Sequence, residues 1–171
     1  MKSLMAVEEF DCSAETYWEK FMFDDAFFEK LNLMIQMKKR EVLERKDSDT
    51  ELYRKIKNTP SMELPGIVSK VIGSDASYFE ESWFNKNTKA YRFQITSAAA
   101  GKRLDFQGTI AIVPLGDKKC RREMRANFNV KVMLIGGKIE EHLARRLEDS
   151  YHAITKFTRE EITKLYLCAP S

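Results

Sequence analysis

Apolar residues recur at helical spacing along the final part of the chain. They are separated by three, four or five positions and comprise Ile135, Ile139, Leu143, Leu147, Tyr151, Ile154, Phe157, Ile162 and Leu165. Such spacing places apolar side chains on one face of an α-helix. We therefore predict a single long amphipathic helix that begins at the segment Leu134–Lys138 and ends near Leu167.

The chain before this helix shows the two-residue period of β-strands. Apolar and polar residues alternate in several segments, most regularly from Met124 to Val132. The segments predicted as strands are 4–12, 33–44, 51–58, 78–85, 90–97, 104–114 and 124–132. Short turns join most of them, which favours an antiparallel sheet with one buried face and one solvent-exposed face.

Three short helices interrupt this pattern of strands. Ser13 is a typical N-cap for a helix over 13–23 with an aromatic face, and an aspartate can cap a second helix over 24–32. A third, two-turn helix is predicted between Pro65 and Gly73, because proline favours helix starts and glycine favours helix ends. The first two helices need an apolar surface to pack against.

The order of these elements predicts an α+β fold. A strongly curved antiparallel sheet of six to seven strands would wrap around the long C-terminal helix, with two short helices after the first strand. The amphipathic helix must bury its apolar face against another layer, and the sheet is that layer. We expect one domain over residues 1–171, because this length and 43% hydrophobic residues are enough for a full core.

The concave face of such a sheet and the facing side of the helix would form a mostly apolar pocket. Ligand cavities of roughly 300–1,000 Å³ have this kind of lining. The residues expected to contact a ligand are Trp83, Tyr91, Phe93, Phe106, Ile110, Met124, Phe128, Leu143, Arg146, Leu147, Tyr151 and Ile154. Phe79 is the alternative to Trp83, and the same side chains could instead form a filled core that holds no ligand.

The charged residues near this pocket cannot be assigned to one face from the pattern alone. A shift of one residue in register exchanges the two faces of a strand, so Glu80, Arg92 and Arg125 can each face inward or outward. His142 and Arg146 lie four positions apart beside the apolar face of the long helix, where they could present a cation to a ligand head group or simply be solvated.

Charge and composition exclude an obligatory polyanionic partner. The chain has 29 basic and 26 acidic residues and a net charge of +3, which is too balanced to indicate nucleic acid or an anionic membrane. Basic residues do cluster at Lys38–Arg40 and at Lys118–Arg122, and we interpret both clusters as solvated strand ends.

The three cysteines, Cys12, Cys120 and Cys168, indicate neither a metal site nor a disulfide framework. They form no CxxC pair and have no short spacing to the two histidines, so we expect no metal. An odd number of cysteines without a secretory leader is typical of a reducing compartment, and the first apolar stretch is too short for a signal peptide. We therefore expect a cytoplasmic protein.

No known catalytic pattern is recognisable. The sequence contains no Ser, His and Asp set, no pair of carboxylates at a recognisable spacing and no cofactor motif. Gly136-Gly137-Lys138 lacks the other residues of a phosphate-binding loop, so a strand-to-helix joint is the better interpretation. We expect no cofactor, and catalysis by scattered pocket residues stays open.

Two segments resemble START-like, or helix-grip, proteins of the SRPBCC superfamily, which includes steroidogenic-acute-regulatory-related lipid-transfer domains, birch-pollen-allergen-like proteins and polyketide cyclases. The segments are Phe10-x-Cys12-Ser13-Ala14-Glu15-x-x-Trp18-x-x-Phe21 with Asp25-x-Phe27 after it, and Lys131-x-x-Leu134-Ile135-Gly136-Gly137-Lys138-Ile139-Glu140. The resemblance covers nearly the whole chain. With Leu64-Pro65 opening an extra helix, the chain is similar to an uncharacterised branch rather than to a named lipid carrier.

This resemblance implies binding of a lipid or another apolar small molecule, for transport or sensing, in the cavity between the sheet and the C-terminal helix. Two other classes stay open. One is an enzyme of the polyketide cyclase or hydrolase type that uses the same cavity, and the other is a module for protein interaction or transient membrane contact. A fold-level analogy does not decide among them.

Overall fold

The computed structural model describes the chain except for residues 1, 62–65, 67–68, 70–73, 132–135 and 168–171. Its elements are β1 (Lys2–Phe10), α1 (Ala14–Tyr17), the π-helix η1 (Trp18–Met22), α2 (Asp25–Met34), β2 (Met37–Asp47), β3 (Glu51–Pro60), β4 (Tyr78–Asn85), β5 (Tyr91–Ser97), β6 (Gly101–Gly116), β7 (Lys119–Val130) and α4 (Gly136–Leu167). The predicted α+β helix-grip fold is confirmed. The helix predicted between Pro65 and Gly73 falls mostly on residues outside the described part of the chain.

The strands form one seven-stranded antiparallel sheet in the order β1-β7-β6-β5-β4-β3-β2. Strands β2 to β7 pair with their neighbours in sequence, and β1 adds to the free edge of β7. The register is irregular at four places, within β2, at the end of β5 and near the end of β6. Such bulges increase the local twist of a strand, and they help to curve the sheet towards α4.

Alternating burial separates the two faces of the sheet. The buried residues of β7 occupy every second position: Cys120, Arg122, Met124, Ala126, Phe128 and Val130. Gly108 of β6 lies opposite Ala126, and a Cβ atom there would be 2.5 Å from the carbonyl oxygen of Arg125 and 2.7 Å from the ring of Phe93. Only glycine fits at this point of the concave face.

The N-terminal helices begin where their caps predict. The Ser13 side chain accepts a hydrogen bond from the Thr16 backbone N–H at 3.0 Å, and Asp24 accepts one from Ala26 at 2.8 Å. Such caps satisfy backbone donors that the first helical turn leaves free, and each is worth about 1 kcal/mol. The two helices pack their aromatic side chains against the concave face of the sheet.

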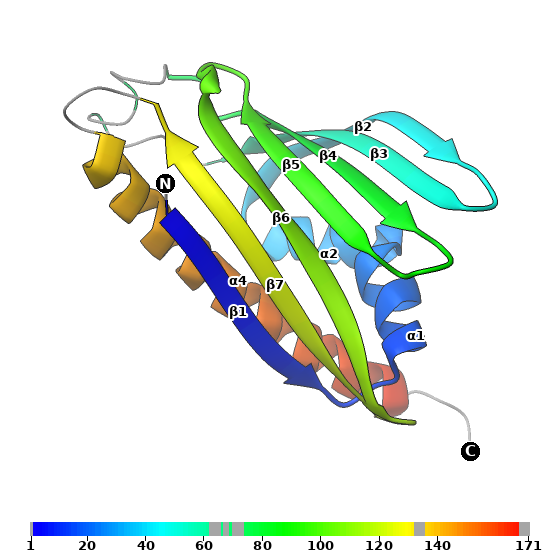
Figure 1. Ribbon diagram of the computed structural model, residues 1–171. Helices are drawn as coiled ribbons and strands as arrows, with labels where there is room; N and C mark the ends of the chain where they lie inside the picture. Colours follow the sequence, from blue (N-terminus) through cyan, green and yellow to red (C-terminus); the bar gives the residue numbers. More distant parts are fainter. Residues whose placement is uncertain (1, 62–65, 67–68, 70–73, 132–135, 168–171) are drawn as a thin grey trace.

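Helix α4 lies across the concave side of the sheet. Figure 1 shows it running beneath β1, β7 and β6, while α1 and α2 lie beside it under the other half of the sheet. Ala144 and Ile162 of α4 are buried. Leu147, Tyr151, Ile154 and Phe157 of the predicted apolar face also pack against the core, whereas Leu165 at its end is exposed.

One boundary between helix and strand differs from the prediction. Leu33 was expected to begin a strand, but α2 continues to Met34, and β2 begins at Met37. Between them Gln36 has a φ of 55°, a left-handed conformation that ends the helix. The apolar residues around Leu33 fit either period, so the sequence does not locate this junction.

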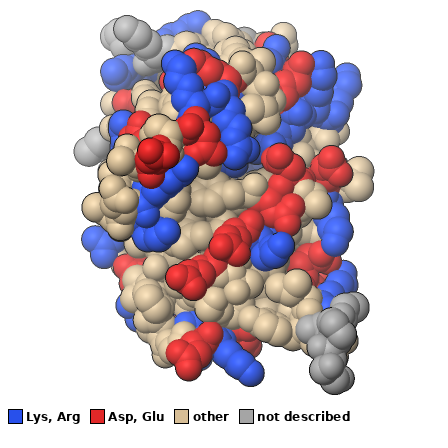
Figure 2. Space-filling model, turned by 90° about the vertical axis from the view of Figure 1, so that its right-hand side faces the viewer, with Lys and Arg blue, Asp and Glu red and all other residues tan. Residues whose placement is uncertain are grey.

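No helix in the described part of the chain is long and apolar enough to cross a membrane. Figure 2 shows the side of the molecule that lies at the right in Figure 1. Basic and acidic side chains are intermixed on this face, around an area that carries neither.

Candidate functional site

Most of the predicted pocket residues lie in one interior region. Six are on the concave face of the sheet: Tyr91, Phe93, Phe106, Ile110, Met124 and Phe128. Three are on the side of α4 that packs against this core: Leu147, Tyr151 and Ile154. The structure thus gathers these side chains between sheet and helix, and their role as ligand contacts stays a prediction.

Trp83 is the predicted pocket residue that the structure contradicts. Its side chain lies on the convex face, where the guanidinium carbon of Arg92 lies 4.0 Å from the centre of its ring and the Tyr53 ring is 5.6 Å away. Phe84, the next residue, faces inward instead, 4.7 Å from Trp18 between ring centres. Two adjacent aromatic residues are compatible with either alternation, so the pattern alone does not favour Phe84 over Trp83.

Two predicted residues of α4 do not contribute a described interior side chain. Arg146 is exposed to solvent. The side chain of Leu143, and that of His142 beside it, lie outside the described part of the structure. Arg146 does not lie in the interior, so its position does not support the prediction that this part of α4 presents a cation to a ligand head group.

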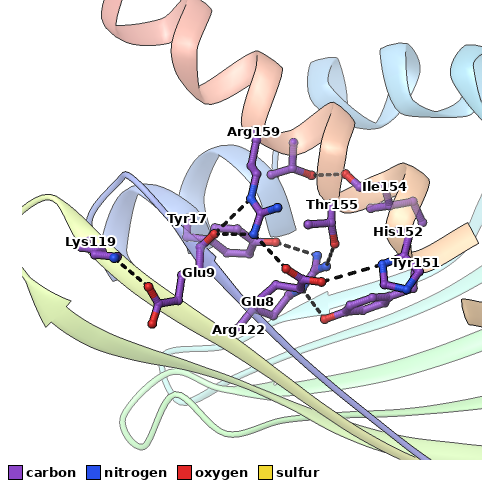
Figure 3. Close-up of polar contacts among 11 residues, drawn as sticks. Glu8, Glu9, Tyr17, Lys119, Arg122, Tyr151, His152, Ile154, Thr155 and Arg159 are labelled. Carbon is purple, nitrogen blue, oxygen red and sulfur yellow. Dashed lines mark hydrogen bonds and ion pairs between the residues drawn. The ribbon is translucent and has the colours of Figure 1, made fainter.

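A buried arginine joins three elements at one end of the concave face. Arg122 of β7 is only 5% exposed. Its guanidinium donates to the Tyr17 hydroxyl at 2.7 Å, to the Tyr151 hydroxyl at 2.7 Å and to Thr155 Oγ1 at 2.8 Å (Figure 3). Burial raises the pKa of Tyr17 and Tyr151, so their hydroxyls stay neutral acceptors. The arrangement ties β7 to α1 and α4.

The prediction that the cluster Lys118–Arg122 is a solvated strand end is wrong for Arg122. This residue lies two positions before Met124 on β7, and therefore on the buried face of the strand. The alternation of the strand was visible in the sequence, so the inward position of Arg122 could have been found. Its partners could not, because Tyr17 and Tyr151 are 105 and 29 residues away in sequence.

A second charged cluster lies on the concave face of the β2–β5 half of the sheet. Arg54 of β3 is 4% exposed, and Glu80 of β4 and Arg40 of β2 are partly buried near it. Burial raises the pKa of Glu80, although Arg54 and Arg40 act in the opposite direction. Burial also lowers the pKa of Arg40, whose guanidinium lies 4.6 Å from the Phe28 ring. We call Arg40, Arg54 and Glu80 the inner charged cluster.

The sequence left this inner charged cluster unidentified. Arg54 alternates in step with Leu52 and Ile56 of β3, but the alternation alone does not mark it as a site residue. Glu80 was left open between the two faces, and the structure places it inside, whereas Arg92 and Arg125 are exposed and lie outside. Arg40 was interpreted as solvated, and that prediction is wrong.

Two buried cysteines lie together where β7 begins. Cys12 and Cys120 are fully buried free thiols. The interaction with the Cys120 thiol, together with burial, raises the pKa of Cys12 above its ordinary value, and the same interaction lowers the pKa of Cys120. Because Cys12 stays protonated, it is neither a nucleophile nor a metal ligand at neutral pH. Among the described residues, no group of three His, Cys, Asp or Glu side chains could hold a metal ion.

Two hollows lined by described residues lie outside this interior. One, of about 380 Å³, lies between β1 and α4 and is bordered by Lys2, Leu4 and Arg145. The other, of about 340 Å³, lies on the convex face above Gly108 and is bordered by Trp83 and Arg92. Neither hollow includes a residue of the inner charged cluster.

Solved structures from several organisms share this architecture. The aromatase/cyclase Zhui from Streptomyces sp. R1128 is 12% identical, with a TM-score of 0.68 over 95% of this chain and 94% of that one. A START superfamily protein from Mycobacterium smegmatis is 14% identical, with a TM-score of 0.61 over 95% and 98% of the two chains. Norcoclaurine synthase from Thalictrum flavum is 20% identical, with a TM-score of 0.59 over 93% and 87%.

These likenesses confirm the START-like, SRPBCC fold that the sequence resembles, and at such low identity they establish the fold alone. No curated protein sequence matches the chain. A family model does match it over residues 6–162, which is most of its length. The chain therefore belongs to the DUF2505 family, which is described as a protein of unknown function.

Proposed function

We propose that this protein binds an apolar small molecule between the concave face of the sheet and α4. The observation that carries the proposal is the incomplete burial of apolar side chains that point into this interior. Ile95 and Ile110 of the sheet and Leu147 of α4 face the core, yet each is only partly buried. Apolar side chains that stay accessible inside a fold leave surface that a ligand can cover.

The surroundings of these side chains suit an apolar ligand. Phe93, Phe106 and Phe128 pack edge to face in a row, with ring centres 5.6 and 6.1 Å apart. Covering apolar surface contributes roughly 25 cal/mol per Å², so such a site can bind without many polar contacts. Norcoclaurine synthase, a fold neighbour, has been solved in complex with dopamine and hydroxybenzaldehyde, which supports a small organic ligand here.

Filling this interior tests the proposal. Replacing Leu147 with Trp would occupy the accessible space, so we expect uptake of the neutral fluorophore 1-aminoanthracene to fall at least tenfold. Leu165→Trp is the matched control, because Leu165 is exposed on the same helix. Equal uptake by both variants would contradict the proposed site. Native mass spectrometry of freshly purified protein, followed by extraction, would identify any ligand that is carried along.

Catalysis in the same space is a second candidate, favoured by Glu80. A carboxyl group whose pKa is raised by burial can act as a general acid or base. Zhui, another fold neighbour, is an aromatase/cyclase. The test is to incubate the protein with its extracted ligand and to follow the ligand mass. A change in mass that disappears in Glu80→Gln, with binding retained, would support an enzyme over a carrier.

A further inference from the structure

The inner charged cluster occupies neighbouring positions on three strands. Arg54 pairs with Ser82 across β3 and β4, and Glu80 pairs with Ile56, the next inward residue after Arg54. Arg40 on β2 pairs with Asn58, the inward residue after Ile56. Arg54 and Glu80 are thus diagonal neighbours, whose Cα atoms are about 7–8 Å apart and whose long side chains can reach one another. Arg40 lies farther along the register, and its charge interacts with those of Glu80 and Arg54. The three charges therefore share one part of the concave face.

Arg54 has few partners for a buried cation. Its Nη2 donates to the Met22 carbonyl oxygen at a long 3.4 Å, and its guanidinium also interacts with the Tyr91 hydroxyl, whose pKa it lowers against the larger effect of burial. The face of the guanidinium lies 5.1 Å from the centre of the Phe23 ring. A guanidinium has five N–H donors, and burying one without strong acceptors is costly. These contacts leave donors of Arg54 without an acceptor among the described residues.

Arg122 shows how the same chain satisfies a buried arginine that has a structural role. Its three donor nitrogens each meet a hydroxyl oxygen between 2.7 and 2.8 Å. Arg54 is buried to the same extent but has no comparable set of acceptors. The difference makes Arg54 a candidate for binding a molecule outside the chain.

The charge balance of the cluster favours an anion. Two guanidinium groups face one carboxyl group, and none of the ion pairs within 4.0 Å among the described residues includes Arg40, Arg54 or Glu80. Because burial favours the neutral form of Glu80, its charge offsets the arginines only in part. One further negative group would balance the cluster, and a carboxylate can accept two parallel hydrogen bonds from a guanidinium.

We infer that the inner charged cluster binds the anionic head group of an otherwise apolar ligand, and that this ligand is an organic carboxylic acid. This inference rests on the proposed function, because the apolar part of the ligand would occupy the space beside Ile95, Ile110 and Leu147. Arg54 donates hydrogen bonds to the carboxylate, which is its main partner, and Arg40 adds positive charge nearby. The protein thus selects an acid over a neutral molecule of the same shape.

Isothermal titration of delipidated full-length protein with dodecanoate and dodecan-1-ol, both below their aggregation limits, tests this selection. The wild-type protein should bind dodecanoate at least tenfold more tightly than the alcohol. Arg54→Met should remove this preference and leave the affinity for the alcohol within threefold. Arg92→Met is the matched control, because Arg92 is an arginine on the convex face of the same sheet, and it should change neither affinity.

Each outcome of these titrations is decisive. The inference is overturned if the wild-type protein binds dodecanoate and dodecan-1-ol with equal affinity, or if Arg54→Met weakens the binding of both equally. Either result leaves the proposed function intact. Binding of neither probe overturns both. If Arg54→Met does not fold, the comparison of the two probes on the wild-type protein still decides. Glu80→Gln then supplies a second variant, which should bind dodecanoate at least as tightly as wild type.

Discussion

The hydrogen bond between Tyr17 and Arg122 gives a direct test of how this fold is held together. Tyr17→Phe removes the hydroxyl that accepts from Arg122 at 2.7 Å and leaves a guanidinium N–H without a partner in a buried site. A hydrogen bond to a charged group contributes about 1.5–3 kcal/mol. For a chain of this size, each kcal/mol shifts the melting temperature by about 2–4 °C, so we expect a decrease of about 3–12 °C.

The same substitution in an Arg122→Met background separates this bond from other effects. Without the guanidinium, the Tyr17 hydroxyl is buried and has lost its donor, so its removal should cost little or should even stabilise the protein. The loss of stability caused by Tyr17→Phe should therefore be larger in the wild-type protein than in the Arg122→Met background by at least about 1 kcal/mol. Thermal unfolding followed by circular dichroism measures both losses. Tyr166→Phe, at an exposed position on α4, is the control and should be neutral. An equal loss in both backgrounds would refute the reasoning.

Three further substitutions probe other parts of the structure. Gly108→Ala would place a Cβ atom 2.5 Å from the Arg125 carbonyl oxygen and should destabilise the protein by about 1–3 kcal/mol in chemical unfolding, whereas Gly137→Ala, with open space around it, should not. Ser13→Ala removes a helix cap and should cost about 1 kcal/mol by the same measurement. Glu80 has a pKa raised above 4.5 in the folded protein, so the folded state holds its proton more tightly than the unfolded state. The stabilisation that this proton contributes is therefore fully present below pH 4.5 and is lost as the pH rises through the folded pKa. Over that range the melting temperature of the wild-type protein should fall relative to that of Glu80→Gln. A difference in melting temperature that does not change with pH would contradict the raised pKa.

The fold was predictable from the sequence because burial follows the period of each element. The alternation in β7 and the helical spacing in α4 each specify one buried face, and a curved sheet around a helix is the arrangement that buries both. The predicted ends of β4 and α4 agree with the structure. The junction near Leu33 was predicted wrongly because its apolar residues fit both a helix and a strand.

The polar groups of the interior were harder to predict, for a physical reason. Hydropathy marks arginine and glutamate as solvent-exposed, but their position on a strand decides which face they occupy. Arg54 and Arg122 alternate in step with buried apolar neighbours, so their inward direction was available from the sequence. What each one contacts depends on residues far away in the chain, and no local pattern carries that information.

The two buried arginines should respond to substitution in opposite ways. Arg122→Met removes a cation that three hydroxyls satisfy, and leaves those hydroxyls without a donor, so it should lower the stability of the protein. Arg54→Met removes a cation whose desolvation is only partly offset, and burial already favours the neutral form of the neighbouring Glu80, so this substitution should be neutral or stabilising. A residue that lowers stability in the ligand-free protein is retained when it serves binding. Thermal unfolding of both variants would reveal the contrast, and a large loss of stability in Arg54→Met would assign Arg54 a structural role like that of Arg122.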